Sequence, residues 1–472
     1  TCALPILQDY LVFQFCLGTK TLFQHVNELP PAYTLTAKDG KYHISKYWEV
    51  YYELDFDHTP QYFEEKLRHL LDESIQLHTR SDVPIGAYLS GGIDSSIIGA
   101  VASKHQSHAG PFMGFNGKFA IGDEYDESAY ARALAEKHNM TLHEVNITSH
   151  DFIDSIEDVI YHLDYPVAGP GSFPQYHVSK LASQHRKVVL GGQGGDEIFG
   201  GYTRYLMAYF EQCIKSAING TMHNGNFIVT YESIIPNLRS LKNYMPLLQE
   251  FWKEGFQDSH DARYFRLINR APSLKSEINW DLFQSYSPFD NYKEIFHGKN
   301  VGKESYFDSM THFDFKTLLR ALLHVEDRMS MAHGVESRVP FLDHPLVEFA
   351  ATMPSNIKFK DGTLKMVLVN AMRHVLPDAI LNRKDKMGFP VPLTQWLKHD
   401  IKDFVTDIFS SSCMQDRAYF NQKEILTALE SESKFGRKIW GLLSLELWHR
   451  QFHDRHHEFR QLLKEQELEA IK

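Results

Sequence analysis

The sequence has few cysteines, and those it has are far apart. Cys2, Cys16, Cys213 and Cys413 are the only four among 472 residues, and no two of them have the CxxC spacing of a thiol pair or zinc knuckle. This pattern argues against a disulfide framework and against a cysteine zinc site. A reducing cytoplasm is the compartment that it favours.

An excess of positive charge and a long apolar run are also missing. The formal net charge is −11, whereas proteins that neutralise nucleic-acid phosphates carry an excess of lysine and arginine. No apolar run approaches the length that crosses a bilayer, and no basic-then-apolar signal opens the chain. We therefore expect neither a nucleic-acid partner nor a membrane partner. At this length, two or three domains are expected.

Strands alternate with helices in the first half of the chain. Residues 33–47 read as a β-hairpin around Asp-Gly, and residues 60–82 have apolar positions at helical spacing. Between residues 83 and 192, short apolar runs alternate with amphipathic segments, which predicts a doubly wound, mostly parallel α/β sheet. From about residue 205 helical patterns dominate, and residues 454–472 predict a charged, exposed helical tail.

The strand predicted at "VPIGAYL" runs directly into "SGGIDSS". Glycines let a backbone approach an anion, and the first turn of a helix offers free N–H donors. A carboxylate among them suggests a bridging Mg²⁺. The sequence therefore predicts a phosphate cradle, although a strand–turn–helix connection with a capping serine is the commoner alternative. No Gly-Lys-Ser/Thr follows, so this is not a Walker loop. The residues of the cradle are Ser90, Gly91, Gly92, Asp94, Ser95 and Ser96.

A second strand end, "KVVLGGQGGDEIFGGY" over residues 187–202, repeats this order of residue types. Gly191 and Gly192 precede Gln193, and Asp196 follows within the same loop. Carboxyl ends of neighbouring parallel strands meet at one edge of a sheet, so Asp94 and Asp196 could share one Mg²⁺ and the phosphates of one nucleotide. Taken alone, the segment would also fit a flexible glycine loop with solvated acids.

Two later stretches concentrate charge. In "LLHVEDRMSMAHGVESRVPF", Asp327 and Arg338 lie among apolar residues, which indicates paired, partly buried ions. Such ions either stabilise the fold or line a site. In "LNRKDKMGFPVP", Lys386 and its cationic neighbours precede a Gly-Phe-Pro turn. They could neutralise a leaving pyrophosphate, or they could form a basic surface turn.

Together these stretches resemble the synthetase domain of the glutamine-dependent asparagine synthetases. "SGGIDSS" is similar to the pyrophosphatase loop of the N-type ATP pyrophosphatases, and "GGQGGDEIFGGY", "DRMSMAHGVESRVPFLDHP" and "KMGFPVPLTQWL" resemble the asparagine-synthetase branch. The resemblance covers residues 6–453. It implies a remnant of a class II glutamine amidotransferase domain over residues 1–55, an ATP pyrophosphatase domain with a helical C-terminal part over residues 60–453, and the tail.

The resemblance also implies roles for single residues. Asp94 and Asp196 would bind Mg²⁺, and Lys386, Gln193, Asp327 and Arg338 would belong to the catalytic machinery. The ATP-binding residues would be Leu89, Ser90, Gly91, Gly92, Asp94, Ser95, Ser96, Met113, Gly191 and Gly192.

The implied reaction is ATP-dependent amide formation. A carboxylate, first of all the side chain of L-aspartate, would be adenylated with release of pyrophosphate, and ammonia would then displace AMP.

The sequence departs from the family in two ways that bear on this reaction. Only the end of a glutaminase domain is present, so this chain is expected to use ammonia, with glutamine as the source in a full-length form. Gln193 replaces the usual glutamate and cannot act as a base.

Several alternatives stay open at this point. Gln193 is compatible with a related enzyme that amidates or cyclises a sugar, peptide or other carboxylate. A sulfur-inserting tRNA enzyme is disfavoured by the absence of CxxC and by the acidic charge balance. An inactive truncated homologue is disfavoured by the presence of Asp94, Asp196 and Lys386. A homodimer is compatible with the sequence, which does not determine the oligomeric state.

Overall fold

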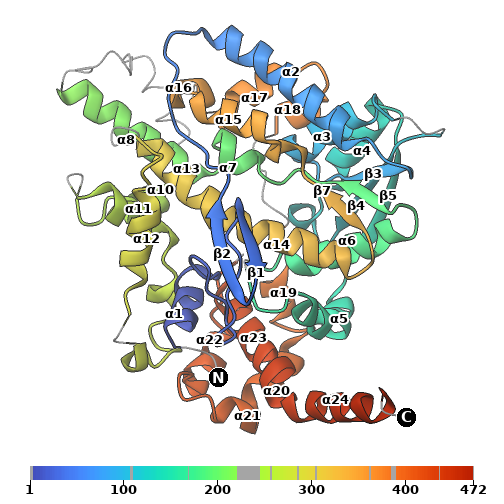
Figure 1. Cartoon of the computed structure of the whole chain (residues 1–472), viewed down its shortest axis with the longest axis vertical. Helices are drawn as coiled ribbons and strands as arrows, with labels where there is room; N and C mark the ends of the chain where they lie inside the picture. The colour runs from blue at the N-terminus through green and yellow to red at the C-terminus, as the bar shows by residue number, and fades with distance from the viewer. Residues whose placement is uncertain are drawn as a thin grey trace.

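The computed structural model describes residues 4–106, 110–167, 169–219, 245–255, 258–283, 286–302, 306–360, 363–383, 390–434 and 436–470. Helices cover most of the chain, and the larger of its two sheets lies to one side of the molecule (Figure 1).

The larger sheet has five strands in the order β5-β4-β3-β6-β7, and every neighbouring pair is parallel. The strands are β3 (Ile85–Tyr88), β4 (Met113–Lys118), β5 (Thr141–Asn146), β6 (Val188–Leu190) and β7 (Glu336–Arg338). The first four confirm the predicted parallel sheet. The sequence analysis missed β7, because its three residues follow a long helix and carry two charges.

Helices cover both faces of this sheet. On one face, α3 (Ile93–Ala102) packs on β3, and α4 (Ser128–Lys137) packs on β4 and β5. On the other face, α6 (Ser172–Ser183) packs on β4 and β5, and α14 (Leu318–Met331) packs on β7. The side chains of β3 alternate accordingly, because Ala87 belongs to the core with α3 whereas Tyr88 belongs to the core with α6. This is the doubly wound arrangement that the sequence predicts.

The N-terminal segment is not an appendage of the sheet domain. Its hairpin, β1 (Tyr33–Lys38) with β2 (Lys41–Lys46), is antiparallel as predicted and largely exposed. Helix α1 (Leu4–Phe13), by contrast, is part of the same apolar core as α23 (Lys438–His449). The Tyr10 hydroxyl donates to the Gly441 carbonyl over 2.9 Å. The predicted amidotransferase remnant therefore packs directly against the C-terminal helices.

The remaining helices lie above, below and to the left of the sheet in the view of Figure 1, and both marked chain ends lie in its lower part. They are α2 (Pro60–His78), α5 (Ser149–His162), α7 (Gly195–Phe199), α8 (Thr203–Asn219), α10 (Met245–Phe251), α11 (His260–Ile268), α12 (Pro288–Phe296), α13 (Tyr306–Lys316), α15 (His344–Thr352), α16 (Ser355–Lys358), α17 (Met366–Met372), α18 (Asp378–Leu381), α19 (Leu393–Trp396), α20 (Lys402–Ser410), α21 (Ser412–Gln415), α22 (Gln422–Ala428) and α24 (His456–Ala470). The last of these matches the predicted charged tail. Throughout the described ranges, every helix is too short or too polar to cross a bilayer.

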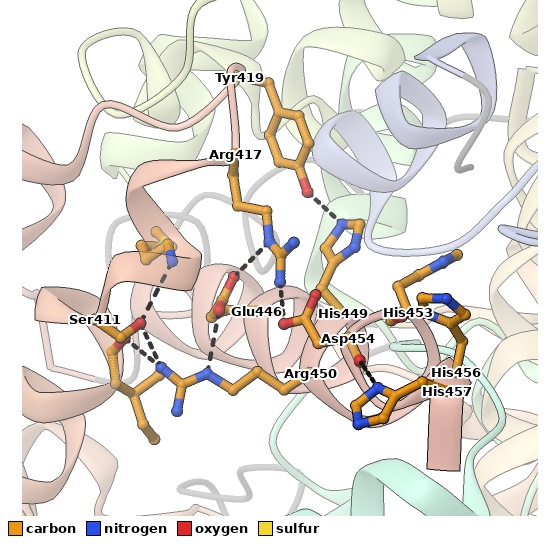
Figure 2. Close-up of polar contacts among 12 residues, drawn as sticks. Ser411, Arg417, Tyr419, Glu446, His449, Arg450, His453, Asp454, His456 and His457 are labelled. Atoms are coloured by element: carbon orange, nitrogen blue, oxygen red, sulfur yellow. Dashed lines mark hydrogen bonds and ion pairs between the residues drawn. The ribbon is translucent and has the colours of Figure 1, made fainter. Parts of the chain in front are cut away.

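A buried ion network fixes the end of α23 to the helices around it. Glu446 has no exposed surface and accepts hydrogen bonds from Arg417 Nε at 3.2 Å and from Arg450 Nε at 3.1 Å (Figure 2). Arg417 also donates to Asp454 at 2.6 Å, which lies in the π-helical turn Arg450–Asp454. Beside them, burial lowers the pKa of His449 to about 2, so this imidazole stays neutral.

Candidate active site

A cavity of about 650 Å³ opens at the carboxyl ends of the strands, where open α/β sheets bind their ligands. Strands β3, β4 and β6 and the loops that follow them form one wall. Their lining residues are Tyr88, Leu89, Ser90, Asp94, Ser95, Phe115, Asn116, Gly117, Gly191, Gly192, Gln193 and Asp196. The structure thus brings the two predicted glycine–carboxylate loops to one site.

The first loop has the geometry of an anion cradle. Gly92 is the N-cap of α3 and provides no side-chain cap, so the first N–H groups of this helix are left for a ligand. The Ser95 hydroxyl folds back to accept from the Ser90 N–H at 3.2 Å. Gly91 has a φ of +71°, and an added Cβ would lie 2.6 Å from Tyr130 Cβ. A glycine is therefore needed here by the turn itself.

The second loop packs directly on the first. A Cβ added to Gly192 would lie 2.7 Å from the Ser95 nitrogen, and one added to Gly195 would lie 2.7 Å from Asp94 Cγ. These glycines are explained by contact between the two loops, which the sequence analysis did not foresee. The contact holds Asp94 and Asp196 in a fixed relation to each other.

A lysine that the sequence analysis missed joins these two carboxylates. Lys365, just before α17, lies beneath the loops; its Nζ is 2.6 Å from Asp94 and also forms an ion pair with Asp196. Burial favours a neutral amine, but Asp196 and Asp94 outweigh it and raise the pKa of Lys365 well above its ordinary value. A single lysine before an apolar helix gives no signal in the sequence.

The convergence of Asp94 and Asp196 on one cation bears on the expected metal. Mg²⁺ is commonly held by one or two carboxylates together with substrate phosphates. Across the described residues, no three histidine, cysteine or acidic side chains cluster as a metal cage would. Two carboxylates beside a phosphate cradle therefore fit Mg²⁺ that arrives with a nucleotide.

Gln193 faces a buried carboxylate. Its Nε2 donates to Glu326 Oε2 at 3.5 Å, and the Ser337 hydroxyl donates to Glu326 Oε1 at 2.6 Å. Glu326 is 4 % exposed, and burial raises its pKa. The neighbouring Asp327, the predicted catalytic residue, is exposed and lies outside the cavity lining. The helical spacing of α14 turns Glu326 inward and Asp327 outward, so the cavity-facing carboxylate is Glu326.

Two further predicted residues are also displaced from the cavity. Arg338 ends β7 and donates to Glu336 at 2.6 Å and to the carbonyls of His78 and Arg80 at 2.8 Å, so it ties β7 to the end of α2. Met113 is the first residue of β4, so it lies at the amino end of this strand, whereas the cavity opens at the carboxyl ends. The residues of β4 that reach the site are Phe115, Asn116 and Gly117.

The other predicted residues fall into two groups. Gly91 and Ser96 belong to the first loop and the start of α3 but do not line the cavity. Lys386 lies outside the described residues, as does Cys2. Arg383, three residues before Lys386 in the sequence, forms an ion pair with Glu127 and donates to the Gly91 carbonyl at 3.2 Å. It therefore braces the first loop.

A parallel, doubly wound sheet with "SGGIDSS" after its central strand is the fold of the N-type ATP pyrophosphatases. The family model described as asparagine synthase matches residues 66–450. Glutamine-hydrolyzing asparagine synthetase 1 of Bacillus subtilis (strain 168) is 31 % identical over 457 residues, which are 94 % of this chain and 68 % of that protein. The chain belongs to the asparagine synthase family.

Other relatives are more distant. Glutamine-hydrolyzing asparagine synthetase 3 of the same Bacillus strain is 26 % identical over 438 residues, 89 % of this chain and 63 % of that protein. A protein of Gibberella zeae named amidase chry2 is 25 % identical over 447 residues, 88 % of this chain and 65 % of that protein. The similar proteins thus carry more than one functional name.

Proposed function

We propose that this chain forms an amide from a carboxylate and ammonia at the expense of ATP. The acceptor carboxylate attacks the α-phosphorus, pyrophosphate leaves, and ammonia then attacks the acyl carbon of the adenylate with release of AMP. The observation that carries this proposal is the contact between the two glycine loops, which directs Asp94 and Asp196 to one cation beside a phosphate cradle.

The first step brings two anions together, so its catalysis depends on positioning and on neutralising charge. We assign the α3 N–H groups, Ser90 and Ser95 to the phosphates, and Leu89 with Phe115 to the border of the adenine. Mg²⁺ held by Asp94 and Asp196 would supply positive charge at the phosphates when it is bound. Lys365 supplies a second cation there, and Lys386 is assigned to the departing pyrophosphate.

The second step requires a proton acceptor, because ammonia gives up a proton when it becomes an amide. Gln193 cannot accept that proton, but it donates to Glu326, whose raised pKa makes it a stronger base than an ordinary carboxylate. We assign Glu326 as the proton acceptor and Gln193 as the group that orients it. Glu326 is thus the catalytic carboxylate that we propose on α14, whereas the sequence analysis named its neighbour Asp327, without a defined role.

L-Aspartate is the acceptor that we propose first, with asparagine as the product, ammonia as the nitrogen donor of these 472 residues and the cytoplasm as the compartment. In a longer form, glutamine would provide the ammonia. We also propose that the chain forms a homodimer. Gln193, where the family usually has glutamate, favours a second candidate, the amidation of a different carboxylate.

The test is pyrophosphate release by the purified chain with ATP, Mg²⁺, ammonium chloride and a panel of carboxylic acids that includes L-aspartate. We expect release that depends on both ATP and an acid, with the matching amide seen by mass spectrometry. Replacing ammonium with glutamine should abolish amide formation. Background release with every acid, from a folded sample, would refute amide synthesis; release with another acid alone would establish the second candidate.

A further inference from the structure

Part of the main cavity is lined by apolar side chains to which the proposed chemistry gives no role. They come from the N-terminal segment and from helices α11, α13 and α14. We refer to six of them as the apolar wall, namely Phe13, Phe15, Ile268, Phe313, Leu322 and Val325. Because Phe13 and Phe15 belong to the predicted amidotransferase remnant, this segment contributes directly to the main cavity.

The aromatic rings of the apolar wall are packed against one another. The ring centroids of Phe13 and Phe15 are 5.6 Å apart with nearly parallel planes, and those of Phe13 and Phe313 are 6.1 Å apart. All three residues are buried in the same core. Ring pairs at such distances stabilise each other beyond the area that they bury. The wall is therefore a packed part of the cavity, and it joins the N-terminal segment to α13.

The apolar wall extends to the proposed proton acceptor. On α14, Leu322 and Glu326 are four positions apart, so they share one face of the helix, and Val325 directly precedes Glu326. All three line the cavity. The carboxylate of Asp314 in α13, which also lines it, is bound by Arg204 at 2.5 Å, so the protein itself neutralises this charge beside the wall. A carbon atom held within reach of Glu326 is therefore also close to apolar side chains.

An acyl-adenylate needs protection, because water attacks its acyl carbon as ammonia does. The bond from that carbon to the phosphate oxygen then breaks, the acid and AMP leave, and a proton passes to solvent. The net result is ATP converted to AMP and pyrophosphate with no amide formed. Water is far more concentrated than ammonia, most of which is ammonium at neutral pH and has no lone pair to attack with. A site that makes the amide therefore has to exclude water from the intermediate.

We propose that the apolar wall keeps water away from the acyl carbon and thereby sets how much of the adenylate becomes amide. A water molecule is held in a cavity only where about two to four polar groups bind it, and apolar side chains offer it none. Phe15 and Leu322 line the cavity from two separate segments, so they are the positions at which the wall is tested. The inference rests on the proposed function, because the adenylate is the intermediate of that reaction.

The experiment measures amide and pyrophosphate in the same reaction, with ATP, Mg²⁺, ammonium chloride and L-aspartate, or with whichever acid of the panel supports pyrophosphate release. We expect the unmodified chain to form close to one amide per pyrophosphate. Phe15→Ser and Leu322→Ser should each lower that ratio to about one half or less, because a hydroxyl group binds water where an apolar side chain excluded it. Raising ammonium chloride about tenfold should restore much of the ratio, because ammonia and water compete for the same adenylate.

Matched variants separate the wall from general damage to the fold. Phe15→Leu and Leu322→Met keep an apolar side chain and should keep the ratio near that of the unmodified chain. Phe420→Ser and Leu426→Ser change partly buried side chains of the same core that do not line the cavity, so they should leave the ratio unchanged even if both products form more slowly. Thermal unfolding identifies any serine variant that fails to fold. Phe15→Tyr or Leu322→Asn, which keep the size of the side chain, then replaces it and should lower the ratio in the same way.

Two results would overturn the wall and leave the proposed function standing: an unchanged ratio in the polar variants at both positions, or an equal fall of the ratio in the Phe420 and Leu426 controls. Failure of the proposed function looks different. Pyrophosphate release without any amide in the unmodified chain would refute both amide synthesis and the wall. No pyrophosphate with any acid would refute the reaction at its first step, and the wall with it.

Discussion

Asp94 and Asp196 both pair with Lys365 in the structure, and removing either carboxylate should weaken the use of ATP. Asp94→Asn removes one negative charge from Lys365 and from the proposed Mg²⁺ site, so we expect kcat/KM for ATP to fall roughly 100-fold. Pyrophosphate release measures the effect. Asp57→Asn, which changes an exposed carboxylate outside the cavity lining, is the matched control. Equal activities of the two variants would remove Asp94 from the site.

A second prediction concerns Gln193 and Glu326. Gln193→Glu would place a second carboxylate where an amide now donates to Glu326 at 3.5 Å. Two charges at about 4 Å repel by roughly 4 kcal/mol at an effective dielectric near 20, so the pair would hold a proton to higher pH. Because Glu326 must be ionised to accept a proton, the acidic limb of the pH profile for amide formation should move upward by about one unit or more.

Gln193→Met tests the same contact without a new charge. It should lower the rate of amide formation and leave the acidic limb near its original position, because the pKa of Glu326 is set mainly by burial. An unchanged profile for Gln193→Glu would mean that Glu326 is not the titrating base. The two variants therefore separate the role of the charge from the role of the hydrogen bond.

Residue types in the sequence identified the loops but not every side chain that acts in them. Asp94, Asp196 and Gln193 were predictable, because each follows a glycine-rich strand end. Lys365 was not, because its partners are far away in the chain and no local pattern marks it. The sequence analysis named Asp327 and not Glu326, because the sequence does not show which of two adjacent acids on a helix points inward; only packing determines that.

At the scale of secondary-structure elements, the Glu446 network should contribute strongly to stability. Glu446→Ala would leave Arg417 and Arg450 without the buried carboxylate between them (Figure 2). Breaking a buried ion pair from one side typically costs about 3–5 kcal/mol, so we expect the midpoint of thermal unfolding to fall by roughly 5 °C or more. Differential scanning calorimetry is the measurement.

The control for that prediction lies on the exposed helix α24. Glu458→Ala removes a surface pair with Arg455, and such solvated pairs add little to stability, so the midpoint of thermal unfolding should barely change. An equally small shift of the unfolding midpoint for Glu446→Ala would mean that the network is solvated in solution.

Among the secondary-structure elements, the sequence predicted strands β3 to β6, because alternating or continuous apolar runs define them. The strand β7 is too short and too charged for any periodicity to appear.

At the scale of the whole molecule, the N-terminal segment is part of the core. A chain that starts at residue 56 would lose a set of side chains that are at most 7 % exposed, namely Leu7, Tyr10, Leu11, Val12, Phe13, Phe15, Leu17 and Leu22. We expect this shortened chain to be insoluble or to unfold without a cooperative transition. A chain that ends at residue 455, which loses only the charged tail helix, should stay folded and active. A soluble, cooperative chain from residue 56 would contradict the prediction.

The close approach of Gly192 to Ser95 has a consequence for how this family can change over time. Even one added carbon at Gly192 or Gly195 would overlap the first loop, so neither loop can be enlarged while the other keeps its shape. The two segments are far apart in the chain, yet natural variation must treat them as a single inherited unit. Directed evolution toward a new nucleotide would therefore need libraries in which both loops vary together.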